Sequence, residues 1–393
     1  MPRPAFEVAD IFRAHSRQYR AQTNLPYHQL RLMTAIESCR TAALGGHVEN
    51  CGHCGHERIS YNSCCNRHCP KCQNLARTKW LESRKAELLP IDYYHVVFTI
   101  PSQLNDLALR NQALFYKLLF DTSAATMQII AADPKHRLGA KIGFFSILHT
   151  WGQNLLFHPH IHCVVTGGGI SSDGSQWVTC KPKFFLPVEV LSALFRGLLI
   201  EALKLAFLNN QLKFPGIIAG LKDPAAFHSL VEPLKKIKWV VYAKPSFGGP
   251  LQVLEYLGRY THRVAISNQR ILAFNNGQVT FQYKDYRSAH KQKSRSMTIS
   301  GGEFIRRFML HSLPPGFQRI RHYGLFASRK KKQNLALCRQ LLGVIIDGLI
   351  PTAVQIQQTL SALLDQSRDC PVCHAGLMIR TRILAKVRWC DSS

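Results

Sequence analysis

The stretch HPHIHCVVT at residues 158–166 contains histidines at alternating positions. In a β-strand, residues two apart point to the same face, so His160 and His162 project together while Ile161 turns into the core. Two imidazoles on a rigid strand form a preorganised site for a divalent metal ion. The same pattern also fits histidines that only pack, and the strand alone does not decide between the two.

A second stretch, residues 255–263, places Tyr256 and Tyr260 four positions apart. On a helix these two side chains share a face. Tyrosine is able to act as a covalent nucleophile, and neighbouring Arg259 and Arg263 suit a phosphate group. An aromatic stripe in a core is the alternative interpretation.

Cysteine pairs mark a third kind of chemistry. Cys51 and Cys54 form one CxxC pair, and Cys69 and Cys72 form another. Two such turns complete a tetrahedral structural Zn2+ site, which we expect here. Further candidate ligands leave room for a second ion; these are Cys64, Cys65, His47, His53, His56 and His68.

The last cysteines form a looser group. Cys370 and Cys373 make a single CxxC pair, and Cys390 and His374 are the nearest additional ligands. One pair does not complete a zinc site, so free thiols and a second zinc knuckle both remain open.

The charge indicates a polyanionic partner. The chain has 50 Lys and Arg against 23 Asp and Glu, a net charge of +27. Such a surface attracts nucleic acid, whereas a lipid anchor beside the basic residues is not evident, so no membrane partner is expected. Residues 284–332 hold thirteen basic residues against two acids, which predicts a basic groove, with a solvated face as the alternative.

Several elements must position these residues. Helices are expected within 9–44 and over 73–89, 104–132, 190–208 and 251–262, and strands over 93–100, 143–151, 160–166, 239–242, 270–274, 279–283 and 296–299. Gly167-Gly168-Gly169 should end the histidine strand. Strands separated by helices without strict alternation predict an α+β fold with helices packed on a sheet. From about residue 335 the tail reads as helices that end in the terminal cysteine group.

These motifs together carry a family resemblance. HPHIHCVVTGGG with YLGRYTHRVAIS resembles the HUH superfamily of single-strand DNA nucleases, and most closely the two-tyrosine transposases of rolling-circle insertion sequences, the IS91 type. The supporting stretches, which run in order from about residue 25 to 345, are CGHCGHERISYNSC, NRHCPKCQ, HVVFTIP, LHTWGQNLLFHPHIH, FQYKDYR and RIRHYGLFA.

The resemblance implies a five-stranded antiparallel sheet with helices, related to the RNA-recognition fold. HVVFTIP would be a central strand with the histidine strand beside it. His160 and His162 would hold Mg2+ or Mn2+, and Tyr256 and Tyr260 would be the nucleophiles. Members usually have a third protein ligand, for which Gln153, His158 and Glu255 are all open.

The expected reaction joins a tyrosine to the 5′-phosphate of a cut single strand and frees a 3′-hydroxyl. The substrates would be single-stranded DNA at insertion-sequence ends and target DNA, in the bacterial cytoplasm at the nucleoid. The residues expected to bind DNA are Arg259, Arg263, Lys284, Arg287, Arg319 and Arg321.

The expected organisation has three parts. Residues 1–90 form a helical and zinc-binding DNA-binding domain, 91–335 form the HUH catalytic domain, and 336–393 form a helical tail with the terminal cysteines. Three rival functions use part of the same sequence: a rolling-circle replication initiator, a metal-dependent nuclease that uses water, and a zinc-ribbon DNA-binding protein without catalysis.

Overall fold

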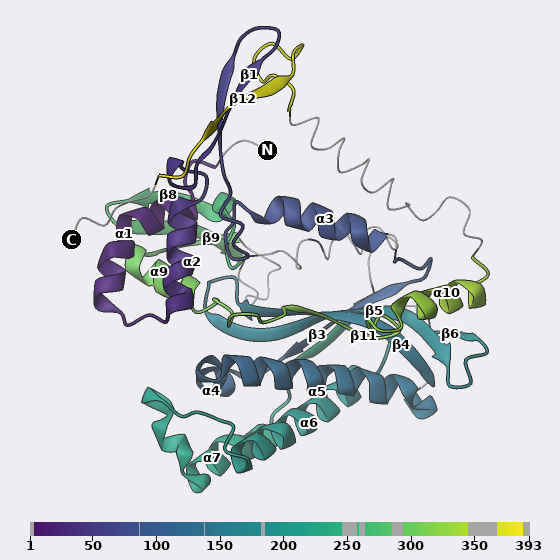
Figure 1. Ribbon diagram of the computed structural model, residues 1–393. Helices are drawn as coiled ribbons and strands as arrows, with labels where there is room; N and C mark the ends of the chain where they lie inside the picture. Colours follow the sequence, from purple (N-terminus) through teal and green to yellow (C-terminus); the bar gives the residue numbers. More distant parts are fainter. Residues whose placement is uncertain are drawn as a thin grey trace.

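The computed structural model describes residues 4–85, 87–136, 138–181, 185–245, 258, 264–284, 294–344 and 368–387. Over these residues the chain is an α+β protein with antiparallel sheets, which confirms the predicted fold class (Figure 1). No helix in the described ranges is both long and apolar enough to cross a bilayer. Short 3-10 helices connect the elements at Ala42–Leu44, Ser102–Leu104, Pro134–His136, Gly216–Lys222, Glu232–Lys235 and Asn268–Arg270.

The central sheet carries the histidine strand in its middle. In spatial order its strands are β11 (Ile320–Gly324), β4 (Ala140–Trp151), β5 (Phe157–Ser171), β3 (Tyr93–Thr99) and β7 (Val241–Pro245), with β6 (Trp177–Thr179) paired to β5. Each pairing is antiparallel. The predicted neighbourhood of the HVVFTIP strand and the histidine strand is therefore confirmed, since β3 pairs directly with β5.

Helices cover one face of this sheet. They are α4 (Asn105–Arg110), α5 (Gln112–Ala132), α6 (Val188–Leu208) and α7 (Pro224–Val231), all on the lower side in Figure 1. Phe98, Ile161 and Cys163 are fully buried on this helix-covered face. Because side chains alternate along a strand, His160 and His162 point to the opposite face. Burial of the apolar side chains on one face of each strand thus determines which face the polar side chains occupy.

Two helices lie over the opposite face. They are α3 (Gln73–Lys85) and α10 (Lys331–Leu341), which Figure 1 shows on the upper side of the sheet. Trp80 of α3 packs edge-on against Phe145 of β4, with ring centroids 5.8 Å apart. Leu335 and Cys338 of α10 are buried in the same apolar cluster.

A second core joins segments far apart in the sequence. It is formed by α1 (Val8–Gln22), α2 (Tyr27–Ser38), α9 (Gly301–Met309) and the sheet of β8 (Ile271–Asn275), β9 (Gln278–Lys284) and β10 (Ser294–Ser300). Phe12 of α1 meets Phe308 of α9 with centroids 5.3 Å apart, and both are buried. The first helices therefore pack against residues of the predicted catalytic domain.

A narrow three-stranded sheet projects from the body, at the top of Figure 1. We call it the arm; it consists of β1 (Gly46–Cys51), β2 (Glu57–Tyr61) and β12 (Met378–Leu384), in the order β12-β1-β2. The C-terminal strand β12 is antiparallel to β1, with Gly46 opposite Leu384 and Cys51 opposite Met378. The tail thus returns to the N-terminal zinc-binding region.

Some predicted elements differ from the structure. Strand β5 does not end at the three glycines but continues through them to Ser171. A Cβ on Gly168 would lie 2.5 Å from the Val178 carbonyl oxygen, and one on Gly169 would lie 2.4 Å from that of Lys141. These glycines therefore permit close backbone approach within the sheet. The predicted helix at 251–262 falls, except for Gly258, outside the described residues.

Candidate functional site

Three histidines meet on the face of the central sheet that α5 and α6 leave uncovered. His160 and His162 lie on β5, and His149 lies on β4 directly opposite His160. One ligand nitrogen from each ring lies within 4.8 Å of the others. His149 and His162 are buried, with ring centroids 4.5 Å apart, and His160 is partly buried. The structure therefore brings the two predicted ligands together and adds a third.

The hydrogen bonds of the rings favour metal binding. His160 Nδ1 lies 2.7 Å from the carbonyl oxygen of His158, a pairing in which this nitrogen must donate its proton. His162 Nδ1 lies 2.8 Å from Nε2 of His95, which is on β3. A ring nitrogen paired in this way, with the other ring nitrogen on the metal, is typical of metal-ligating histidines. The donor set fits a divalent ion with open positions.

Burial keeps the supporting histidine neutral. Desolvation lowers the pKa of His95 to about 4, so near pH 7 its ring carries no charge. A neutral His95 shares a hydrogen bond with His162 through Nε2 and leaves the site without an added positive charge. The Tyr242 ring contacts His95 edge-on at 6.0 Å, which helps to hold its orientation.

Sequence reasoning missed His149. The residue ends the apolar run of β4, where it stacks on Trp151 with centroids 4.6 Å apart. The sequence signal was a lone histidine within an apolar run; its burial, at 2% exposed, is known only from the structure. Among the earlier candidates for a third ligand, His158 is not part of the three-histidine group, and Glu255 lies outside the described residues.

The tyrosine motif is described at one position only. Tyr256, Tyr260, Arg259 and Arg263 lie outside the described residues. Gly258 between them is buried and helical, and a Cβ there would lie 2.8 Å from the side chain of Leu81. Leu81 belongs to α3, which packs over the histidine face of the sheet.

A cleft of about 420 Å³ lies beside the histidine strand. His158 lines it, and the His158 and His160 rings are 5.3 Å apart. Tyr283 and Lys284 at the end of β9 form another wall. The remaining lining residues are Ser102, Asn105, Gly152, Gln153, Asn154, Leu156 and Phe157.

The residues predicted to bind DNA fall in different places. Lys284 is exposed at the cleft, whereas Arg321 lies 4.4 Å over the Phe120 ring of α5 and 3.7 Å from Asp121. Arg321 therefore serves the helix-covered face, not the histidine face. Arg319 is only partly exposed, and burial lowers its pKa to about 10. Arg287 lies outside the described residues.

The two N-terminal CxxC pairs lie in separate clusters, which corrects the prediction that they form one site. Cys69 and Cys72 meet Cys39 and Cys64 in what we call the basal cluster. The arm-tip cluster instead contains Cys51, Cys54, Cys370 and Cys373. Strand β1 carries the first pair to the far end of the arm, so spacing along the chain could not show which pair meets which.

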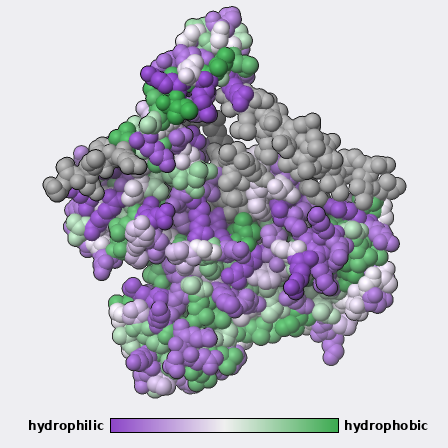
Figure 2. All heavy atoms as spheres, in the orientation of Figure 1, coloured by the Kyte–Doolittle hydropathy of each residue, from purple (hydrophilic) through white to green (hydrophobic). Residues whose placement is uncertain are grey.

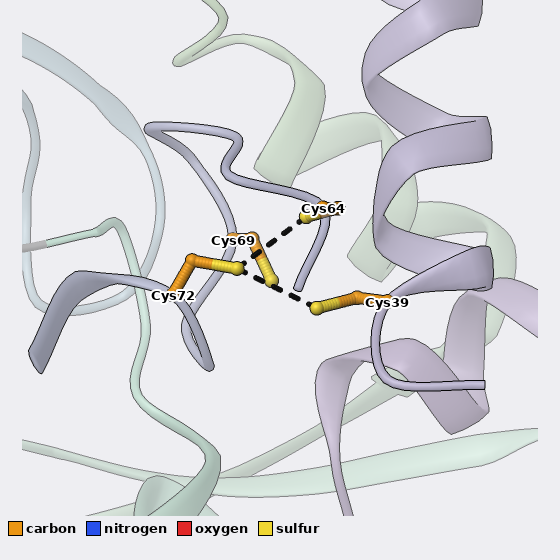
Figure 3. Close-up of side chains that lie close together, drawn as sticks. All are labelled: Cys39, Cys64, Cys69 and Cys72. Atoms are coloured by element: carbon orange, nitrogen blue, oxygen red, sulfur yellow. Dashed lines mark hydrogen bonds between the residues drawn. The ribbon is translucent and has the colours of Figure 1, made fainter. Parts of the chain in front are cut away.

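The basal cluster has the geometry of a four-thiolate zinc site. Figure 3 shows its four side chains pointing toward one another, and Cys39 Sγ and Cys64 Sγ each lie 3.5 Å from Cys72 Sγ. Hydrogen bonds from the Cys39 thiol first, and then from Cys64 and Cys69, lower the pKa of Cys72. A thiolate at this position is what zinc requires. The cluster connects the end of α2 to the start of α3.

Comparisons with known proteins agree with these features. Residues 11–100 match the family described as "Transposase zinc-binding domain", and residues 143–334 match the family described as "Putative transposase". The first segment contains the basal cluster, and the second contains His149, His160 and His162. Cys370 and Cys373 lie outside both.

Two relatives extend the match to nearly the whole chain. "Putative transposase y4qJ" of Sinorhizobium fredii is 56% identical over 387 residues, which covers 98% of this chain and 96% of that protein. The transposase for insertion sequence element IS801 of Pseudomonas savastanoi pv. phaseolicola is 27% identical over 358 residues, or 90% and 84% of the two chains. No solved structure matches this chain.

Proposed function

This chain belongs to the IS91-like transposases with an N-terminal zinc-binding domain, and on that premise we propose that it cuts and rejoins single-stranded DNA at insertion-sequence ends. The observation that carries the proposal is the convergence of His149, His160 and His162 on the sheet face opposite α5 and α6, where Nδ1 of His160 and of His162 each has a partner. Mg2+ or Mn2+ held there would polarise a phosphodiester.

The proposed nucleophile is the hydroxyl of Tyr256 or Tyr260. Its attack on phosphorus forms a phosphotyrosine bond to the 5′ end and breaks the bond to the 3′ oxygen, which leaves as a hydroxyl after taking up a proton. One phosphodiester replaces another, so the step is reversible and permits rejoining. Contact of Gly258 with Leu81 supports this role, because Gly258 lies between the two tyrosines in the sequence and Leu81 belongs to the helix that packs on the histidine face.

The cleft beside His158 supports a single-stranded substrate. Tyr283 offers a ring on which a base could stack, and Lys284 offers a cation for a phosphate. Gln153 and Asn154, whose side chains carry amide groups, also line the cleft. An unpaired strand that enters this cleft would lead its backbone toward the three histidines. We propose that the reaction takes place at the bacterial nucleoid. We also propose that the chain is divided into three parts, with boundaries at residues 90 and 335.

A covalent adduct assay tests the proposal. Labelled single-stranded oligonucleotides, tiled across both flanks of the encoding gene, are incubated with protein and Mn2+ and then denatured. We expect a protein–DNA band that Tyr256→Phe combined with Tyr260→Phe removes, whereas Tyr27→Phe, at an exposed ring of α2, retains it. Cutting by the double variant would assign the reaction to water, and the chain would be a metal-dependent nuclease.

A further inference from the structure

The arm-tip cluster combines the two ends of the chain. Cys51 and Cys54 lie at the turn between β1 and β2, while Cys370 and Cys373 precede β12. Cys51 Sγ lies 3.6 Å from Cys373 Sγ, and Cys54 Sγ lies 3.6 Å from Cys370 Sγ. All four sulfurs are within 4.8 Å of one another. Four thiolates around one Zn2+ at 2.3 Å would be about 3.8 Å apart, so the cluster needs little adjustment.

The two cysteine turns are built alike. In the first, Gly55 N donates to Cys51 O at 3.1 Å, and in the second, His374 N donates to Cys370 O at 3.1 Å. Gly55 and His374 both adopt positive φ, +71° and +55°. A non-glycine residue rarely takes this conformation, so its presence at His374 indicates that the second turn is held in the shape of the first.

Backbone amides also donate to the leading sulfur of each turn. His53 N and Cys54 N lie 3.3 and 3.4 Å from Cys51 Sγ, and Val372 N lies 3.4 Å from Cys370 Sγ. Such donors stabilise a negative sulfur, which is the form that binds a metal ion. Free thiols on a loose tail would not need two matched turns aimed at each other.

The two turns are also in close contact. A Cβ added to Gly376 would lie 2.6 Å from Cys51 Sγ and 2.6 Å from the Cβ of His53. Only glycine therefore allows the second turn to approach the first this closely.

The arm has almost no apolar core of its own. Its buried cluster consists of Cys51, Cys370 and Met378, two of which are cluster cysteines. Its larger apolar side chains are exposed instead, including Ile379 at 57% and Ile383 at 78%. Figure 2 shows such hydrophobic residues on the surface of the arm. A sheet this small needs a metal ion or another cross-link to stay folded.

We propose that Cys51, Cys54, Cys370 and Cys373 bind a second Zn2+, which joins the C-terminal segment to the N-terminal arm. Binding replaces four S–H bonds with four Zn–S bonds and releases the protons to solvent. The site is closed, so its role is structural. The site is separate from the basal cluster. The proposal does not depend on whether the chain cuts DNA.

Metal analysis is the first test. We expect two zinc ions per chain in protein purified without chelator, and one in the Cys370→Ser/Cys373→Ser variant. Cys65→Ser is the matched control, because Cys65 is exposed and belongs to neither cluster; it should keep two. A double variant that still holds two zinc ions would overturn the proposal, as would iron in place of zinc at the arm tip.

A second test measures the connection itself. A protease site is inserted between residues 344 and 368, and the cut protein is run on a sizing column. In the parent protein, we expect the C-terminal fragment to stay bound until a chelator is added. In the Cys370→Ser/Cys373→Ser variant, we expect the fragment to dissociate without chelator. Retention of the fragment in the variant, or in the parent protein after chelation, would show that strand pairing alone holds the segment. Release from the untreated parent protein would show that no metal ion holds it.

Discussion

His95 Nε2 lies 2.8 Å from His162 Nδ1, and their rings are stacked 6° from parallel at 5.0 Å. The contact joins β3 and β5, two neighbouring strands of the central sheet. It decides which nitrogen of His162 faces the site, and it leaves the supporting ring without charge near pH 7 because burial lowers the pKa of His95 to about 4.

Replacing His95 should therefore weaken the metal site without removing a ligand. For His95→Ala we expect the Mn2+ concentration at half-maximal nicking to rise about 10- to 100-fold, the usual effect of losing a partner of a metal-bound histidine. Oligonucleotide binding should be unchanged, since His95 supports His162 and belongs neither to the three-histidine group nor to the lining of the cleft. Titration of nicking against Mn2+ checks this, with the exposed His228→Ala as control. An unchanged Mn2+ requirement would mean that His95 only packs.

His149 should matter as much as the two histidines of the HPHIH stretch. We expect His149→Ala to lose nicking while single-strand binding persists, because binding relies on distributed positive charge. Thr150→Ser, at the next buried position of β4, is the matched control and should stay active. Nicking and anisotropy assays on the same preparations separate the two effects. Full activity in His149→Ala would show that His149 is not a ligand of the catalytic metal ion.

Two basic residues should differ in their effect on DNA binding. Lys284 is exposed at the cleft, so Lys284→Ala should weaken single-strand binding and reduce the slope of log affinity against log salt by about 0.7. Arg321 packs on Phe120 beside Asp121, so Arg321→Ala should lower thermal stability and leave that slope unchanged. Fluorescence anisotropy at four salt concentrations measures the salt dependence of binding for each variant. Equal slopes of log affinity against log salt for the two variants would contradict the placement of Lys284.

A buried histidine should make stability depend on pH. His311 lies between Thr150 Oγ1 at 3.2 Å and the Leu155 carbonyl oxygen at 3.1 Å, and burial lowers its pKa to about 4. The unfolded chain, with a histidine pKa near 6.5, takes up the proton first, so stability is full above that pH and falls as the pH drops toward 4. Between pH 7 and 5 the loss is about 2 kcal/mol.

The conservative variant His311→Gln isolates this contribution. Glutamine keeps a donor and an acceptor but does not titrate, so its stability should fall less between pH 7 and 5 than that of the parent protein. Urea unfolding at both pH values, with the same zinc content in each sample, measures the difference. Parallel losses in the two proteins would show that His311 is not protonated on unfolding in this range.

The sequence predicted the strands that carry the site because their apolar patterns are strong. Tyr93–Ile100 and the histidine strand pair as expected. His160 and His162 share a face because side chains alternate along a strand. Strand register is another matter: His149 faces His160 only because β4 pairs with β5 in one particular alignment, which a lone histidine in an apolar run does not reveal.

The cysteines show the same limit more clearly. Spacing identified each CxxC pair, but the tertiary fold determines which cysteines come together in one cluster. Cys39 at the end of α2 became a ligand candidate only once tertiary packing was known, and only packing joined Cys370 and Cys373 to Cys51 and Cys54. The strand β12 was missed for a related reason, since its residues are mostly exposed and lack an alternating apolar pattern.

The pairing of β12 with β1 also sets an order on biosynthesis. Cys54 and Cys370 are 316 residues apart, so a ribosome adding about 5 to 20 residues per second needs roughly 15 to 60 seconds between making one and the other. During that interval the N-terminal hairpin emerges without its third strand, exposing the edge of β1. A message truncated shortly before its end would therefore yield a protein whose first strands never acquire their neighbour.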